Sequence, residues 1–391
     1  MNEADSSQPS PTDAQATPVA LAARGPVALV YSPHAGSVGH NQPQALLERA
    51  GTPVALAMPV SALDASQPLG QQWRDAGCVA AVAAGGDGTV GAVATHAASA
   101  GLPLGILPLG TANDIARALG IPLAPAAAAR VIAQGIIQQV DAGQVIPSQT
   151  APRIAARQTP PTASALNEAL TEQPDQEPSA SGAYFLHALT LGLNVEFARL
   201  ATNVAQRRVW GRFTYAVAAI ESLEHVKPIE VTLRFSGMPG APEESVFVVR
   251  CKTALLTAIN LPIFGGRLGL RVPGIRTDDR LLDFIIVEAP EPVDARAAFE
   301  VALGALTGAA QTLWGGRRMD AADTPVAAHP VQDPAGIALP GARWFRARAV
   351  EIETEQPVDL TLDGELRGRT PAVARVAPHA AQIIVPATRR A

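Results

Sequence analysis

Two stretches of this chain share one layout: a short apolar run, a loop with glycine and polar residues, and then a helix-like run. They are "AAGGDGTVGAVATHA" at 83–97 and "LPLGTANDIARALG" at 107–120. A strand, a tight loop and a helix in this order form one repeat of a parallel α/β sheet. Ligands of such sheets bind beyond the carboxyl ends of the strands. The layout therefore predicts a parallel sheet with a ligand site along one edge.

The sequence around the two stretches extends this sheet. Apolar runs predict strands at 27–32, 52–58, 78–84 and 102–107, and helices at 41–50 and 90–100. Short buried strands that alternate with helices are typical of a parallel sheet covered on both faces. The length of 391 residues favours more than one domain.

Changes in composition divide the chain into four parts. Residues 1–24 are rich in Ser, Pro, Gln and Ala and predict a disordered tail, while 25–146 carry the α/β pattern. Residues 147–182 form a Pro-, Ser- and Ala-rich insertion, and 183–391 predict a β-rich second domain. In this last part, strands are predicted at 184–191, 228–235, 246–252, 255–260, 281–287 and 343–353, and helices at 195–224 and 293–313.

Charge and hydropathy limit the partners and the compartment. The net charge of −5 argues against a general nucleic-acid partner. No apolar run reaches the roughly 18–20 residues of a membrane span, and the N-terminus has no signal-peptide pattern. Cys78 and Cys251 are far apart and predict buried free thiols in a reducing compartment. We expect a cytoplasmic protein whose membrane contact, if any, is peripheral.

The first glycine loop has the residues of a phosphate site. Gly85, Gly86 and Gly88 let the backbone approach a phosphate, and Thr89 is placed to cap the helix or donate to a phosphate. Asp87 would repel a phosphate unless a cation lay between them, so the loop predicts Mg²⁺ together with a nucleotide. The simpler alternative is a plain turn in which Asp87 caps a helix.

The second glycine loop makes the nucleotide interpretation stronger. Thr111 and Asn113 have groups that can donate to a phosphate, and Asn113 or Asp114 is placed to cap a helix that begins near Ile115. Two polar loops at the same sheet edge favour a nucleotide site over two unrelated turns.

Motifs spaced along the chain, in the right order, carry a resemblance to a known family. "GGDGTV" and "PLGTANDIARALG" resemble the diacylglycerol kinase catalytic domain, and the chain looks like the bacterial YegS/DgkB-like lipid kinases, relatives of sphingosine kinases. "YSPHAGS" at 31–37 resembles the nucleotide loop of that family, with Ser32 where Asn is usual and with Gly36 retained. "NLPIFGGRLGLRVPGIRTDDRLLDFIIV" at 260–287 and "LTLDGELRGRTPAVARV" at 360–376 resemble its remaining motifs.

The resemblance implies a fold and a reaction. The fold would be an N-terminal Rossmann-like parallel α/β domain, of the NAD kinase and diacylglycerol kinase type, and a C-terminal β-sandwich-like domain with helices. The reaction would transfer the γ-phosphoryl group of ATP to a lipid hydroxyl, with Mg²⁺ as cofactor and diacylglycerol or a related glycerolipid as acceptor. Glu365 would be the base, with Asp363 beside it and Asp87 as the third catalytic residue. The nucleotide would contact Ser32, Gly36, Gly85, Gly86, Asp87, Gly88, Thr89, Thr111 and Asn113.

The resemblance also implies a structural Mg²⁺ site near residue 279. Asp279 would be the side-chain ligand, completed by the backbone of Leu281 and the neighbourhood of Arg276. Arg280 stands where the family has glycine, and a positive φ there would be unfavourable for it. Asp278 and Asp283 are alternative ligands.

Two other functions stay open from the sequence. An NAD kinase shares the GGDG loop, and a non-catalytic nucleotide- or lipid-binding protein would explain Ser32, Arg280 and the apolar pair Gly91 and Ala92. A homodimer is one possible assembly.

Basic and aromatic residues suggest where a lipid enzyme would meet its surroundings. The "QRRVWGRFTY" segment at 206–215 has the arginines and aromatics of a peripheral contact with anionic lipid, or of an ordinary solvated helix. In "RWFRARAVEIE", alternation would place Trp344, Arg346, Arg348, Val350 and Ile352 on one face of a strand, with the arginines toward phosphate or toward solvent. The histidines show no metal-ligand spacing, and His34 alone lies in a nucleotide loop.

Overall fold

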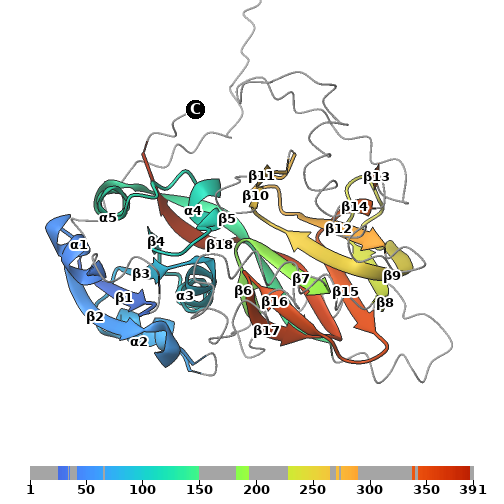
Figure 1. Ribbon diagram of the computed structural model, residues 1–391, viewed down its shortest axis with the longest axis horizontal. Coiled ribbons are helices and arrows are strands. Elements are labelled where there is room, and N and C mark those ends of the chain that lie inside the picture. Colours follow the sequence, from blue (N-terminus) through green and yellow to red (C-terminus); the bar gives the residue numbers. More distant parts are fainter. Residues whose placement is uncertain are drawn as a thin grey trace, which may run out of the picture.

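The computed structural model describes residues 25–33, 35, 42–64, 67–148, 182–192, 228–264, 270–272, 274–288, 337–339 and 342–387. The first half of these residues alternates strands and helices (Figure 1). Its elements are β1 (Val27–Tyr31), α1 (Pro43–Arg49), β2 (Val54–Pro59), the 3-10 helix η2 (Val60–Ala62), α2 (Leu69–Asp75), β3 (Ala80–Gly85), α3 (Asp87–Ser99), β4 (Leu104–Pro108), α4 (Asp114–Ala118), α5 (Pro125–Gln134) and β5 (Ile136–Pro147).

A parallel sheet with the order β4-β3-β1-β2 forms the centre of this half. Every residue of β3 and β4 is buried, because both faces of the sheet are covered by helices. Helices α2 and α3 pack together on one face and α1 and α5 on the other, as Figure 1 shows. The predicted parallel α/β arrangement is confirmed.

The second half is built from antiparallel strands. They are β6 (Ala183–Phe185), β7 (Ala188–Gly192), β8 (Ile229–Ser236), β9 (Val246–Ile259), β10 (Ile263–Phe264), β11 (Leu270–Arg271), β12 (Leu282–Glu288), β13 (Ile337–Leu339), β14 (Ala342–Ala347), β15 (Ala349–Thr354), β16 (Asp359–Leu362), β17 (Glu365–Arg369) and β18 (Ala372–Val385). A second apolar core lies here, in which Phe235 stacks on Phe345 and meets Phe284 edge-on. The β-rich character predicted for this part is confirmed.

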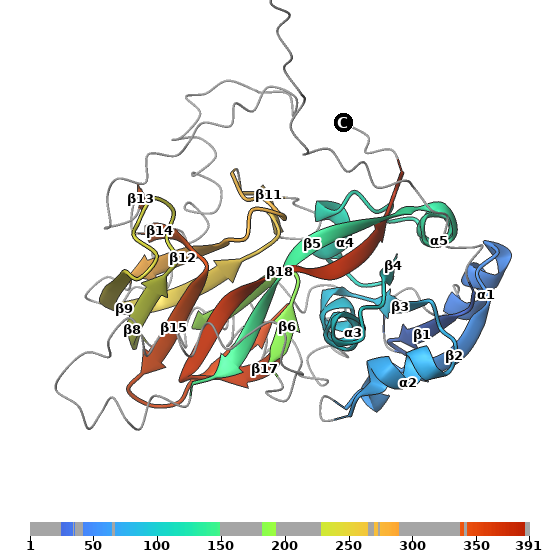
Figure 2. The ribbon, with the colours of Figure 1, turned by 180° about the vertical axis from the view of Figure 1, so that it is seen from behind.

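The long strand β18 joins the two halves. Its first part pairs with β15, most of its length pairs with β5, and Ile383 near its end pairs in parallel with Leu104 of β4. A continuous path of paired strands therefore runs from the parallel sheet into the antiparallel strands, as Figure 2 shows from behind. The β16–β17 hairpin joins this path through β7, which pairs with β16 and with β9.

Four predicted strands have different boundaries in the structure. The runs at 246–252 and 255–260 form the single strand β9, whereas 184–191 is divided into β6 and β7. The run at 343–353 is also divided, because the backbone N–H of Arg348 leaves the ladder and points to Ser236 O and Gly237 O. The expectation of one uninterrupted face from Trp344 to Ile352 is therefore wrong.

Several predictions lie outside the described residues. They concern the tail at 1–24, nearly all of the 147–182 insertion, the helices at 195–224 and 293–313, and the arginine-rich segment at 206–215. The domain boundaries and the sandwich arrangement stay predictions.

Cys78 is buried, Cys251 is half-buried and both are free thiols. Within the described part of the chain, no helix has the length and apolar character needed to cross a membrane.

Candidate functional site

Three strands of the parallel sheet end at one edge and present their loops there. They are β1, β3 and β4, which end at Tyr31, Gly85 and Pro108. The N–H of Ser32 donates to Ala84 O over 2.9 Å, and the N–H of Leu109 donates to Gly85 O over 2.9 Å. The two glycine loops and the start of the 31–37 loop therefore lie side by side, as the sequence predicts. Gly36 and His34 lie outside the described residues.

The second glycine loop packs directly against the first. A methyl group on Gly110 would collide with Cα of Gly86 and lie 2.9 Å from Oδ1 of Asn113. Asn113 closes this loop: its amide nitrogen donates to Gly110 O over 2.9 Å, and its oxygen accepts the Gly110 N–H over 3.0 Å. The Asn113 backbone is left-handed, with φ at 54°, which asparagine tolerates better than most residues. Thr111 beside it is exposed.

Asp87 caps a helix, but the helix is in the next βα unit. Its carboxylate accepts the N–H of Asp114 over 3.1 Å and the N–H of Ile115 over 2.9 Å, at the start of α4. Asn113 occupies the N-cap position of α4, as expected, but its side chain makes no cap bond to the helix because it is used inside its own loop. Each Asp87 oxygen accepts one hydrogen and keeps one further acceptor position.

Thr89 is buried in the first turn of α3 and does not cap that helix. The residue at the N-cap is Gly86, and it makes no side-chain bond. The Thr89 side chain instead fills the space over Gly85, where a methyl group would lie 2.6 Å from Thr89 Cβ. The glycine at 85 is thus required by packing, in addition to any approach of a ligand.

The Asp-Gly-Glu motif forms the turn of the β16–β17 hairpin. Asp363 and Gly364 have φ of 51° and 84°, the left-handed pair of a two-residue hairpin turn. The buried carboxylate of Asp363 accepts three backbone N–H bonds, from Leu186 at 3.0 Å, His187 at 2.7 Å and Ala188 at 3.1 Å. These contacts anchor the turn to the β6–β7 connection and leave the next residue, Glu365, exposed.

Two glycines of α3 let this turn approach the glycine loops. A methyl group on Gly88 would lie 2.8 Å from Cδ of Glu365. A methyl group on Gly91 would lie 2.8 Å from Nη2 of Arg367 and 3.0 Å from Cβ of Asp363. Any side chain at position 91 would push the turn away, which explains why Gly91 carries no polar group. Nothing in the structure explains Ala92.

Known proteins resemble the chain over the region that carries this geometry. A model of the diacylglycerol kinase catalytic domain matches residues 26–145. A chain from Xanthomonas euvesicatoria pv. vesicatoria, named "Probable lipid kinase YegS-like", is 30% identical over 308 residues, which are 77% of this chain and 77% of the relative. The chain belongs to the YegS-like lipid kinase family. A relative of the same name from Pseudomonas aeruginosa is 28% identical over 80% of this chain and 78% of its own length.

Solved structures share the fold of this YegS-like chain. Two structures of chains from Bacillus anthracis str. Sterne have TM-scores of 0.56 and 0.52, at 19% and 16% identity. The first match covers 92% of this chain and 97% of the other, and the second covers 92% and 96%. The second structure is titled a diacylglycerol kinase.

Arg367 is a residue of this YegS-like site that the sequence analysis did not single out. Its Nη2 donates to Leu362 O over 3.0 Å and lies 3.7 Å from Oδ2 of Asp363. Burial raises the pKa of Asp363, and Arg367 and the backbone donors offset part of that rise. Arg367 follows Glu365 by two residues on β17, but the β16–β17 pairing shifts register at Arg367, so simple strand alternation gave no signal for it.

The residues predicted for a structural Mg²⁺ contact other groups of the protein in the structure. The carboxylate of Asp279 contacts the guanidinium of Arg346 and accepts the N–H of Leu281 over 3.2 Å. Arg276 turns to Asp278, with Nη2 3.3 Å from Oδ1. Among the described residues, no three His, Cys, Asp or Glu side chains are grouped to hold a metal ion. Arg280 has φ at 61°, so the expected left-handed position is present and is held by a non-glycine residue.

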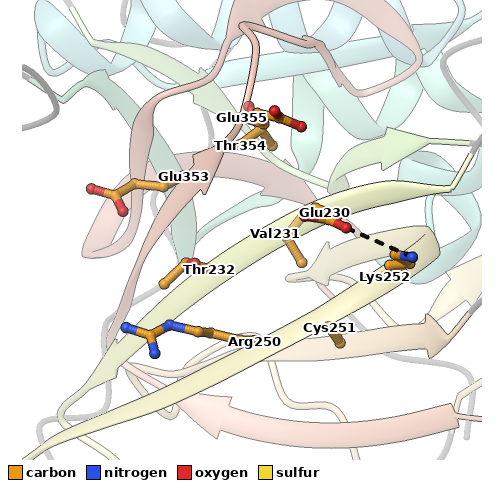
Figure 3. Close-up of a pocket in the computed structure, with 9 residues that line it drawn as sticks. All are labelled: Glu230, Val231, Thr232, Arg250, Cys251, Lys252, Glu353, Thr354 and Glu355. Atoms are coloured by element: carbon orange, nitrogen blue, oxygen red, sulfur yellow. Dashed lines mark ion pairs between the residues drawn. The ribbon is translucent and has the colours of Figure 1, made fainter. Parts of the chain in front are cut away.

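A hollow of about 510 Å³ lies apart from these loops, on the strands β8, β9 and β15 (Figure 3). Its lining mixes both signs of charge, with Lys252 3.7 Å from Glu230. None of the predicted site residues line it. The candidate site is therefore the loop edge of the parallel sheet, together with the β16–β17 turn.

Proposed function

We propose that this chain is an ATP-dependent lipid kinase that transfers the γ-phosphoryl group of ATP to a lipid hydroxyl, with diacylglycerol or a related glycerolipid as acceptor. One observation carries the proposal: Glu365, at the β16–β17 turn, packs against Gly88 in the first turn of α3. The exposed carboxylate thereby lies where the glycine loops of the parallel sheet end.

The glycine loops supply the nucleotide side of the site. Gly86 and Gly110 bring two loops into direct contact, and backbone N–H groups at the start of α3 suit phosphate oxygens. Asp87 is the carboxylate that would hold a divalent cation, since each of its oxygens retains an acceptor position beyond its bond to α4. A cation bound with ATP would supply neutralisation of phosphate charge.

Glu365 supplies the base. In the proposed step, a bond forms between the lipid oxygen and the γ-phosphorus, and the bond from phosphorus to the oxygen of the leaving ADP breaks. The hydroxyl proton moves to the carboxylate of Glu365. The oxygens of Asp363 are occupied by three backbone amides, so Asp363 positions the turn and does not take a proton.

The proposed acceptor follows from the family and from the matched diacylglycerol kinase domain. A glycerolipid resides in a membrane, so this activity entails a peripheral contact with a lipid surface. We propose a cytoplasmic protein that meets the lipid there.

The test is an acceptor screen with radiolabelled ATP. Purified protein, Mg²⁺ and γ-labelled ATP are incubated with mixed micelles that contain diacylglycerol, monoacylglycerol, phosphatidylglycerol or a sphingoid base, and the label in extracted lipid is counted. We expect the strongest label in diacylglycerol. Glu365→Gln should lower transfer by about 100-fold or more, as the loss of a general base does.

The matched control is Glu355→Gln, which removes an exposed carboxylate between β15 and β16. This variant should transfer label at the wild-type rate. Absence of label from every lipid, while the protein still binds ATP, would contradict the proposal. Label in NADP instead would make the chain an NAD kinase.

A further inference from the structure

The strands β12 and β14 place one arginine among the acidic residues that follow β11. Asp283 and Arg346 are direct partners across the two antiparallel strands. Nε of Arg346 lies 3.0 Å from Oδ1 of Asp283, and the indole N–H of Trp344 donates to the same oxygen over 2.8 Å. Asp283 is almost fully buried, so its charge depends on these two partners.

The same guanidinium also reaches the loop before β12. Nη2 of Arg346 contacts Oδ2 of Asp279, and both side chains are mostly shielded, at 15% and 16% exposed. A guanidinium has five donors in a rigid planar fork, which suits the bridging of two carboxylates. Arg346 therefore joins Asp279 of the loop to Asp283 of the strand.

The rest of the loop is closed by hydrogen bonds within the protein. The N–H of Arg280 donates to Oδ2 of the buried Asp141 over 2.7 Å, and the N–H of Asp141 donates to Thr277 O over 2.7 Å. The other Asp141 oxygen accepts the N–H of His379 over 2.9 Å. The carboxylates of Asp141 and Asp279 thus both have partners on the chain itself.

We propose that the guanidinium of Arg346 replaces, in this chain, the divalent cation that the family resemblance assigns to the Asp279 loop. The side chain neutralises Asp279 and ties the loop to β14, and its positive charge repels a metal ion from the same position. The loop then keeps its conformation without a metal, and any Mg²⁺ requirement of the protein comes from the nucleotide alone.

The first test measures metal binding to nucleotide-free protein. Mn²⁺ serves as the probe, and bound Mn²⁺ is counted by electron paramagnetic resonance for the wild type and for Asp279→Asn. We expect the two proteins to bind the same amount, because Asp279 holds no metal. One Mn²⁺ per wild-type chain that Asp279→Asn removes would overturn the proposal.

The second test measures thermal unfolding in EDTA. Arg346→Gln should lower the midpoint by about 5 °C or more, because two shielded carboxylates lose their cation. The matched control is Arg348→Gln, whose side chain is 61% exposed and pairs only with the exposed Glu243 in the described part of the chain. Its midpoint should stay at that of the wild type. Equal midpoints for the two variants would overturn the proposal.

Discussion

The turn at Asp363–Glu365 and the loop at Asp279–Leu281 contain the same kinds of residues, but their carboxylates have different partners. Each has a left-handed residue, a shielded aspartate that accepts backbone N–H bonds, and an arginine from a neighbouring strand position. At the turn, Arg367 stays 3.7 Å from Asp363, and Glu365 remains exposed against Gly88. In the loop, Arg346 binds Asp279 and Asp283 together. An acidic motif is therefore a candidate for catalysis only where the fold leaves one carboxylate without a fixed cation.

The largest effect should come from the aspartate of the turn. Asp363→Ala leaves three buried N–H groups, of Leu186, His187 and Ala188, without their acceptor. We expect a loss of about 3 kcal/mol or more in the free energy of unfolding, measured by urea denaturation. In the loop, Asp278→Ala removes a half-exposed carboxylate and should change stability by less than about 0.5 kcal/mol. Equal losses would show that Asp363 is not the anchor of the turn.

The two α3 glycines should separate stability from activity. Gly91→Ala pushes on Asp363, which cannot yield because three amides hold it, so the variant should lose about 1–2 kcal/mol of stability in spite of the better helix propensity of alanine. Gly88→Ala pushes on the end of the Glu365 side chain, which is free to move. Stability should stay at the wild-type value, while lipid phosphorylation falls about 10-fold or more.

Two results for these variants would contradict the expected roles of the glycines. If Gly88→Ala phosphorylates lipid at the wild-type rate, the position of Glu365 against α3 does not matter for transfer. If Gly91→Ala is as stable as the wild type, the turn has room that the contacts of Asp363 do not suggest.

Local patterns in the sequence were sufficient for the parallel sheet and the shared loop edge. Each βα unit is specified by neighbouring residues, so the apolar runs and glycines of the two loops predicted the positions of β3, α3 and β4.

Contacts between distant segments could not be predicted in this way. Nothing in the sequence around Gly91 indicated that Asp363 and Arg367 would lie against it. Asp363, the nearer of the two, is 272 residues further along the chain. Arg346 was expected on an uninterrupted strand face, facing phosphate or solvent, and its cross-strand register with Asp283 depends on how β12 and β14 pair. Asp87 was expected to bind a cation or to cap a helix. Its hydrogen bond to α4 depends on the packing of the two glycine loops against each other.

A smaller, pH-dependent effect should distinguish the loop from the turn. Burial raises the pKa of Asp283 to about 7, although Arg346 and Trp344 lower it, and its ordinary value is 3.8. Between these two values the unfolded chain has released a proton that the folded chain retains. The contribution of Asp283 to stability is therefore complete below about pH 4 and is lost as the pH rises through about 7.

The neutral variant Asp283→Asn does not titrate and provides the reference for this effect. We expect the stability of the wild type relative to Asp283→Asn to decrease between pH 4.5 and pH 7.5, on the order of 1 kcal/mol, measured by urea unfolding in metal-free buffer. A relative stability that is constant or grows with pH would contradict the assignment.

The smallest effect should come from the left-handed residue of the loop. The turn has two left-handed residues, Asp363 and Gly364, and Gly364 carries no Cβ. In the loop, Arg280 has φ at 61° and keeps it through the hydrogen bond from its N–H to Asp141. Arg280→Gly relieves the crowding of Cβ and Arg280→Ala does not, while both remove the same exposed side chain. We expect the glycine variant to be the more stable of the two by about 1 kcal/mol in urea unfolding. If alanine is as stable as glycine at 280, the loop relaxes away from the left-handed conformation, and the hydrogen bond to Asp141 is too weak to hold it there.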